Sequence, residues 1–229
     1  MQNDELLANF SNPDVIARYT QGPPRYMPGY ADMQRMTGVL LAEKIPEDAQ
    51  VLVLGAGGGL ELKVFAETYP GWSFDGVDPA PDMLGLARQT LGPLSSRVRL
   101  HEGYIDDAPE GPFDAATCLL TLHFLAPEER RRTMEEIRRR LKPGAPFVAA
   151  HSSFPQSEAE RPIWLSRYAA FAVASGADPE EVEGARGAVE RSLNTLTPEE
   201  DEALLEAAGF SDIELFYAAF TWRGWLAAA

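Results

Sequence analysis

Cysteine is almost absent from this sequence of 229 residues, in which Cys118 is the single example. One cysteine excludes an intrachain disulfide and also a zinc site made of four cysteine ligands. Cys118 lies in an apolar run, where a free cysteine usually behaves as a small buried hydrophobic residue. We therefore expect neither a disulfide framework nor a metal site.

Positive charge is also scarce, with 20 Lys and Arg residues against 35 Asp and Glu residues and a formal net charge of −15. A surface this acidic repels phosphate backbones and anionic lipids, so we expect neither nucleic acid nor a membrane as a partner. No apolar run approaches the roughly 20 residues of a membrane span, and the start MQNDELLANF lacks the features of a signal peptide. We expect a cytoplasmic protein that acts on a small molecule, while homodimer formation stays open.

Short apolar segments alternate with helix-like segments from residue 50 onward. Strands are expected in VLVLG (51–55), SFDGVD (73–78), RVRLHEG (97–103), FDAATCLLTLHFL (113–125) and FVAAHS (147–152). This alternation predicts parallel βαβ units with helices on both faces of one sheet. The arginine runs at 130–132 and 138–140 are flanked by glutamates, and they are expected to lie on a solvated helix face.

The segments outside this alternation predict additions to the sheet. QGPPRYMPGY (21–30) is expected to be a loop, and ADMQRMTGVLLAEKI (31–45) a helix. After Ser153 two helices follow without a strand between them, and the aromatic segment 212–227 is expected to form a hairpin. We expect one domain, in which residues 1–46 cover the ligand and residues 47–229 form the α/β unit, with a helical lid insert at about 155–195.

A glycine cluster, Gly55-Ala56-Gly57-Gly58-Gly59, follows the first expected strand, and Asp78 ends the second. Glycines let the backbone turn sharply and approach a ligand closely, and an acid at this place can bind both hydroxyls of a ribose. A phosphate-binding NTPase loop is excluded because no Gly-Lys pair follows Gly55. Leu60 stands where the dinucleotide fingerprint requires glycine, which counts against NAD and favours S-adenosylmethionine, a ligand without pyrophosphate.

The chain resembles class I S-adenosylmethionine-dependent methyltransferases over nearly its whole length. The resemblance implies a Rossmann-like α/β fold with a mostly parallel seven-stranded sheet and a C-terminal antiparallel hairpin. Gly55, Ala56 and Gly57 match the loop beside the methionine part of the cofactor, and Asp78, followed by Pro79, matches the ribose-binding acid. The LKPGA turn before the fifth strand is also typical of that superfamily.

Within the superfamily the chain is most similar to carboxy-S-adenosylmethionine synthases, through MPGYADM, TLHFLAPEER and AGFSDIELFYAAF. The resemblance implies cofactor contacts for Tyr30, for the adenine-contacting pair Tyr104 and Ile105, and for Leu119 on the fourth strand. Those synthases carry Asp-Ile at the adenine pair and asparagine at the position of Leu119. Asp106 or Asp107 could replace the missing acceptor for the adenine amino group.

The same synthases hold the extra carboxylate with an arginine, which falls near Ala188 in this chain. Arg191 shares a helix face with position 188 and is the more plausible substitute. Because a carboxylate normally binds a bidentate guanidinium, this departure favours methyl transfer over the synthase reaction.

Other residues are candidates for the chemistry and for substrate binding. His123 follows the fourth strand and His151 ends the fifth, where each could act as a general base or simply pack, whereas His101 is expected to be structural. Further substrate-binding candidates are Arg25 and Tyr26 in the N-terminal loop and Trp164 and Tyr168 on the lid, although such an aromatic stripe is more often core.

The sequence thus predicts an S-adenosylmethionine-dependent methyltransferase acting on a small molecule, with S-adenosylhomocysteine as the product. The alternatives are a carboxy-S-adenosylmethionine synthase-like enzyme and a non-catalytic module that binds the cofactor or has lost it.

Overall fold

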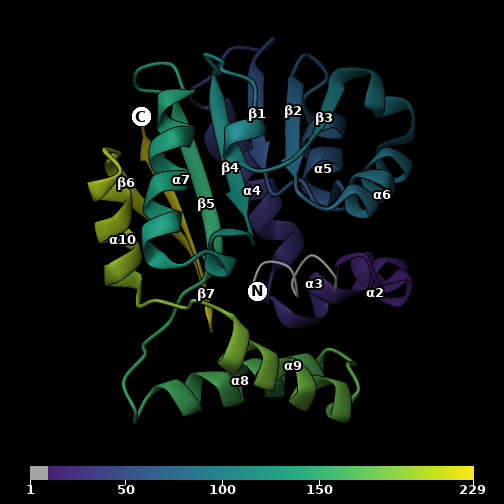
Figure 1. Ribbon diagram of the computed structural model, residues 1–229, viewed down its shortest axis with the longest axis vertical. Coiled ribbons are helices and arrows are strands. Elements are labelled where there is room, and N and C mark those ends of the chain that lie inside the picture. The colour runs from purple at the N-terminus through teal and green to yellow at the C-terminus, as the bar shows by residue number, and fades with distance from the viewer. Residues whose placement is uncertain (1–9) are drawn as a thin grey trace.

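Seven strands form one sheet in the order β3-β2-β1-β4-β5-β7-β6 (Figure 1). The computed structural model describes residues 10–229, apart from the side chains of Asp14, Arg191 and Ser192. The strands are β1 (Gln50–Leu54), β2 (Ser73–Asp78), β3 (Val98–Glu102), β4 (Ala115–Leu119), β5 (Pro146–Ser152), β6 (Ser211–Ala219) and β7 (Trp222–Ala228). β1 to β5 are parallel, whereas β7 runs antiparallel to both β5 and β6. The expected Rossmann-like α/β fold and terminal hairpin are confirmed.

Helices cover both faces of the sheet. Those described are α2 (Pro13–Arg18), α3 (Gly22–Tyr26), α4 (Tyr30–Ala42), α5 (Leu60–Thr68), α6 (Pro81–Leu91), α7 (Pro127–Arg139), α8 (Arg161–Ala174), α9 (Pro179–Ser192) and α10 (Pro198–Ala207). Short 3-10 turns are η1 (Tyr19–Gln21), η2 (Gly92–Arg97), η3 (Ile105–Asp107) and η4 (Leu122–Phe124). α5 contacts α4 and α6 on one face, and α10 contacts α7 on the other. No helix within residues 10–229 is long and apolar enough to cross a membrane.

The central strand β1 divides its side chains between two hydrophobic clusters. Val51 and Val53 belong to the cluster on the α4–α5 face, and Leu52 and Leu54 belong to the cluster on the α7–α10 face. This separation follows from the two-residue period of a strand, which points successive side chains to opposite faces. Cys118 is fully buried in the second cluster, in agreement with its apolar surroundings in the sequence.

The segment 21–30 is mostly helical, so the expectation of a loop there was wrong. Pro23 lies in the first turn of α3, where a missing N–H costs nothing, and Gly29, with φ of +69°, precedes α4. The segment from α2 to α3 lies beside the carboxyl ends of the strands, with the α8–α9 pair beyond it (Figure 1). The indole N–H of Trp222 donates to the carbonyl of Tyr26 at 3.0 Å and ties this segment to β7.

Two arginines of these runs, Arg130 in α7 and Arg140 at its C-terminal cap, are buried, which corrects the prediction that both arginine runs lie on a solvated face. Arg130 is 0% exposed and Arg140 is 1% exposed. Arg130 forms an ion pair with buried Asp201 of α10 and also donates to the carbonyl of Asn194. The sequence could not reveal the burial of Arg130, because its partners Asn194 and Asp201 lie on a distant segment, whereas Arg140 pairs with Glu136, four residues before it.

Replacing Asp201 with Asn should destabilise the protein by about 3–5 kcal/mol, because it leaves the Arg130 charge buried without its counter-ion. Burial opposes ionisation of Asp201, but His151 and Arg130 hold its pKa below the ordinary value. Its contribution to stability is therefore present above the pKa of an unfolded aspartate and is lost as pH falls through the lower folded value. Urea unfolding at pH 7 and across acid pH measures both effects.

Asp48→Asn is the matched control, since Asp48 is exposed. A loss below about 1 kcal/mol in Asp201→Asn, equal to that of the control, would contradict a stabilising role for the buried pair.

Candidate functional site

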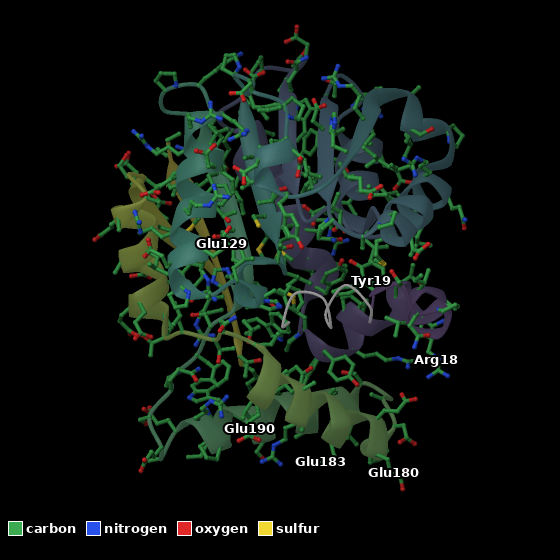
Figure 2. The ribbon with its side chains drawn as sticks, viewed as in Figure 1. Arg18, Tyr19, Glu129, Glu180, Glu183 and Glu190 are labelled. Carbon is green, nitrogen blue, oxygen red and sulfur yellow. The ribbon has the colours of Figure 1, made fainter. Side chains whose placement is uncertain are left out.

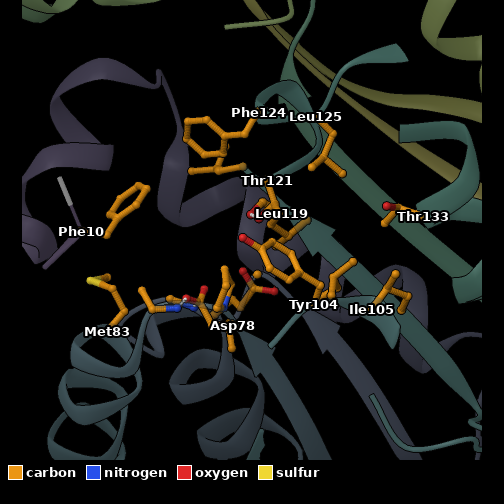
Figure 3. A pocket seen from close by; sticks show the side chains of 18 of the residues that line it. Phe10, Asp78, Met83, Tyr104, Ile105, Leu119, Thr121, Phe124, Leu125 and Thr133 are labelled. Carbon is orange, nitrogen blue, oxygen red and sulfur yellow. Dashed lines mark hydrogen bonds between the residues drawn. The ribbon is translucent and has the colours of Figure 1, made fainter. Parts of the chain in front are cut away.

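A cavity lies at the carboxyl ends of β1, β2 and β4 (Figure 3). Its walls come from the turn between β1 and α5, the end of β2, the β3–η3 turn and the β4–η4 segment. Phe10, Tyr19 and Tyr30 of the N-terminal part also line it. Phe124 lies across the cavity from Asp78, with its ring 6.0 Å from that of Phe10 (Figure 3). Ligands of open parallel sheets bind at this edge, which makes the cavity the candidate functional site.

Glycine is required in the turn after β1 because of close contacts as well as positive φ angles. Gly55 and Gly57 have positive φ angles of +77° and +48°. A Cβ atom on Gly55 would lie 1.9 Å from the Thr121 hydroxyl, so no larger residue fits there. Gly55, Ala56 and Gly57, all expected to bind the cofactor, line the cavity.

Asp78 links the end of β2 to the glycine turn. Its Oδ2 accepts a hydrogen bond from the N–H of Gly57 at 2.8 Å, and its Oδ1 accepts one from the N–H of Ala80 at 2.9 Å. Burial raises its pKa, and the two backbone donors partly oppose that rise. Each carboxylate oxygen has further lone pairs, so Asp78 can still accept from ligand hydroxyls. Pro79 lines the cavity beside it.

Tyr19 was not singled out in the sequence, yet it lies against the glycine turn. A Cβ atom on Gly57 would lie 2.6 Å from the Tyr19 hydroxyl, and one on Gly58 would lie 2.7 Å from its ring. Neighbouring Arg18 lies on the outer side, where it pairs with Glu181 of α9 at 3.0 Å (Figure 2). No local pattern identifies Tyr19, because its contacts are with residues far along the chain.

Glu61 is a second site residue that the sequence did not reveal. It lines the cavity from the first turn of α5, and its Oε1 accepts a hydrogen bond from the Thr117 hydroxyl at 2.9 Å. Burial raises the pKa of Glu61 to about 8, and the Thr117 hydrogen bond opposes that rise. In the sequence an acid here resembles an ordinary exposed residue of a helix N-terminus.

The remaining predicted cofactor contacts all line the same cavity, namely Tyr30, Tyr104, Ile105 and Leu119. Tyr30 accepts a hydrogen bond from Gln34 at 2.8 Å. Tyr104 is 44% exposed, whereas Ile105 and Leu119 are buried.

The two acids considered as adenine acceptors have other partners. Asp107 accepts a hydrogen bond from the N–H of Tyr104 at 2.9 Å, within its own turn. Asp106 forms an ion pair with Arg132 on α7. Neither is among the residues that line the cavity.

The structure places His123 and His151 outside the cavity lining. His123 Nδ1 accepts a hydrogen bond from the N–H of Ser152 at 3.2 Å. Burial, with His151 and Arg130 nearby, lowers the pKa of His123 well below its ordinary value. His151 lies 3.1 Å from Asp201. A catalytic role for either histidine stays a prediction.

His101 lies apart from the other two histidines, in β3. Its Nε2 is 2.8 Å from the buried carboxylate of Asp75, which also pairs with Arg99. This ion-pair network agrees with the structural role expected for His101.

The predicted substrate residues lie in α3, at Arg25 and Tyr26, and in α8, at Trp164 and Tyr168. The ring of Tyr26 stacks on that of Tyr168 at 5.4 Å, and Trp164 lies under the guanidinium of Arg167 at 4.6 Å. Arg25 donates to Gln21 at 3.3 Å. None of these predicted residues lines the described cavity, and the side chain of Arg191 lies outside the described part of the chain.

Residues 51–144 match the family described as a methyltransferase domain. The carboxy-S-adenosyl-L-methionine synthase of Chromohalobacter salexigens is 29% identical, over 93% of this chain and 81% of that protein. The synthase of Actinobacillus succinogenes is 27% identical, over 94% of this chain and 92% of that protein.

Two solved structures share the fold. Human N-acetylserotonin methyltransferase with SAM aligns at a TM-score of 0.59 and 21% identity, covering 86% of this chain and 53% of that one. PigF with SAH aligns at 0.64 and 18% identity, covering 96% and 60%. The present chain therefore spans little more than half the length of these two structures.

The match to the methyltransferase domain family covers less than half of the chain, from residue 51 to residue 144. The S-adenosylmethionine-dependent enzyme class and the cofactor expected from the sequence are confirmed at the level of the family. The reaction and the residues that carry it remain to be assigned.

Replacing Asp78 with Ala should weaken S-adenosylmethionine binding at least about tenfold, a loss of about 1.4 kcal/mol. The change removes a ribose acceptor and also frees the N–H of Gly57, which the carboxylate holds in place. Isothermal titration calorimetry measures the effect. Asp82→Ala is the control, since Asp82 is an exposed acid in the first turn of α6 that does not line the cavity. Unchanged affinity in Asp78→Ala would remove this residue from the site.

Proposed function

We propose that this protein transfers the methyl group of S-adenosylmethionine to a small molecule, with the cofactor held in the cavity of Figure 3. Gly55, Ala56 and Gly57 would lie beside its methionine part, and Asp78 would accept from its ribose hydroxyls. The group fits these residues, because Gly55 and Gly57 line the cavity without a side chain and Asp78 keeps free lone pairs. Tyr30, Pro79, Tyr104, Ile105 and Leu119 would complete the pocket.

The charge of the cavity carries this proposal. Its lining includes the carboxyl groups of Glu61, Asp78 and Glu129, and none of its described lining side chains is Lys, Arg or His. S-adenosylmethionine brings a positive sulfonium, which such surroundings stabilise. The carboxylated cofactor would add a negative charge, and an unpaired carboxylate in a dry site is costly.

The bound sulfonium supplies an already activated methyl group, so the chain has mainly to position the acceptor and exclude water. The predicted cover is residues 1–46, of which 1–9 lie outside the described residues; from the described part, Phe10, Tyr19 and Tyr30 reach the cavity. The helices of residues 155–195 would act as a lid outside that cover. Tyr26 and Trp164 would meet an incoming substrate there, and a role for Tyr168, which is buried and stacks on Tyr26, would require the lid to move.

Carboxy-S-adenosylmethionine synthesis is the second candidate, because curated relatives across most of the chain carry that name. It needs a cation for the extra carboxylate. Ala188 offers none, and Arg186 lies on α9 within 3.4 Å of both carboxylate oxygens of Glu183. Arg191 is therefore the residue on which this alternative depends.

Incubation with S-adenosylmethionine and prephenate, the donor that the resemblance implies, separates the two reactions. We expect mass spectrometry to find no nucleoside heavier than the cofactor by one carboxyl group. Screening small acceptors should instead yield S-adenosylhomocysteine together with a methylated product. A carboxylated nucleoside that disappears in Arg191→Ala would overturn the methyltransferase proposal. A Glu190→Ala variant, which removes the acid beside Arg191, serves as the control.

A further inference from the structure

Glu61 is a buried acid in the cavity to which the proposed reaction gives no role so far. Its side chain reaches the cavity from α5 directly after the glycine turn, and the residue is 7% exposed. The Thr117 hydroxyl, at 2.9 Å from Oε1, is the only hydrogen-bond donor that it has among the described residues. The second carboxyl oxygen therefore remains available to a ligand.

The groups that face Glu61 from neighbouring elements are not cations. They are the phenols of Tyr19 (η1) and Tyr30 (α4) and the thiol of Cys118 (β4), whose pKa values Glu61 helps to raise. Asp78 at the end of β2 adds another negative charge near Tyr19. A carboxylate with such neighbours is costly in the free protein, which agrees with the raised pKa of Glu61, about 8.

A cationic ligand in the cavity reverses this balance. Asp78 is engaged by two backbone N–H groups, and Glu129 is half-exposed and lies within 3.5 Å of Arg132. Glu61 alone combines burial, a free oxygen and a place beside the glycine turn. We propose that Glu61 is the counter-charge of the cofactor's sulfonium, neutral in the free protein and ionised in the complex. This inference rests on the proposed function, since it needs S-adenosylmethionine in this cavity.

As a consequence, Glu61 makes the site bind S-adenosylmethionine and S-adenosylhomocysteine with different affinities. S-adenosylmethionine binding releases the Glu61 proton to solvent. Methyl transfer makes the sulfur neutral, so the carboxylate loses its partner and takes a proton back from solvent. The site then holds S-adenosylhomocysteine no more tightly than an uncharged site would, which favours its release.

Calorimetry from pH 6 to 9 with wild type and Glu61→Gln tests the inference. Glutamine imitates the protonated acid, so the two proteins should bind S-adenosylmethionine equally at pH 6, while the wild type binds it about tenfold tighter at pH 9. S-adenosylhomocysteine affinities should agree within about threefold throughout, because only the sulfonium is missing. Buffers of different ionisation enthalpy should report release of about half a proton at pH 7.5 for S-adenosylmethionine.

Two variants make the result specific. Glu67→Gln alters a half-exposed acid on the same helix and should change neither affinity. Thr117→Val keeps the Glu61 carboxyl but removes its hydrogen bond, which lowers the pKa of Glu61 in the wild type. The pH range over which S-adenosylmethionine affinity increases should therefore move upward in this variant. A purely structural role for Glu61 would not produce that displacement. Thermal unfolding confirms that each variant is folded.

Equal losses for both nucleosides in Glu61→Gln, or no loss for either, would overturn the inference while leaving the proposed function intact. If the wild-type protein binds neither nucleoside, the proposed function itself fails.

Discussion

The hydrogen bonds of the Asp78 carboxylate to Gly57 and Ala80 are the interaction on which the site depends. One carboxylate joins the end of β2 to the turn after β1 and to the start of α6. Parallel pairing of β1 with β2 brings these segments to the same sheet edge. The acid therefore shapes the turn before it meets a ligand, and the binding surface is organised in advance, which lowers the cost of binding.

The described lining of the cavity contains no Lys, Arg or His side chain, and the whole sequence is acidic, with a formal net charge of −15. Long-range attraction raises the local concentration of a cationic ligand, while burial makes the nearest carboxyl group sensitive to the charge it meets. Both the long-range attraction and the burial act on the carboxyl group of Glu61, which has no cationic partner among the described residues. The negative charge of the chain and the acidic groups of its cavity thus both favour a cationic ligand.

Local sequence signals predicted the parts of the structure that are themselves local. Gly55, Gly57 and Asp78 could be found because a sharp turn and a strand end need particular residues at a fixed spacing. The parallel βαβ units were predicted from the alternation of strands and helices, and the terminal hairpin from the aromatic segment 212–227, whereas the order of the strands in the sheet was not predicted. Tyr19, Glu61 and Arg130 could not be found in this way, because each owes its role to a partner distant in the chain.

The error at residues 21–30 has the same origin. Three prolines and two glycines favour a loop, but tertiary contacts with α8 and β7 stabilise a short helix there. His123 and His151 illustrate the converse. Topology brings both to the correct end of the sheet, yet side-chain packing directs them into the protein beside Arg130 and Asp201.

The attachment of the N-terminal segment to β7 has a consequence for biosynthesis. The carbonyl of Tyr26 is held by Trp222, which follows it by 196 positions in the chain. β7 itself is inserted between β5 and β6 in the sheet. During translation, the early strands can pair as they emerge from the ribosome, and Tyr26 can stack on Tyr168 before β7 has been made, but the hydrogen bond from Trp222 cannot form until then. This tie between the N-terminal segment and the sheet therefore forms only after Trp222 has been synthesised.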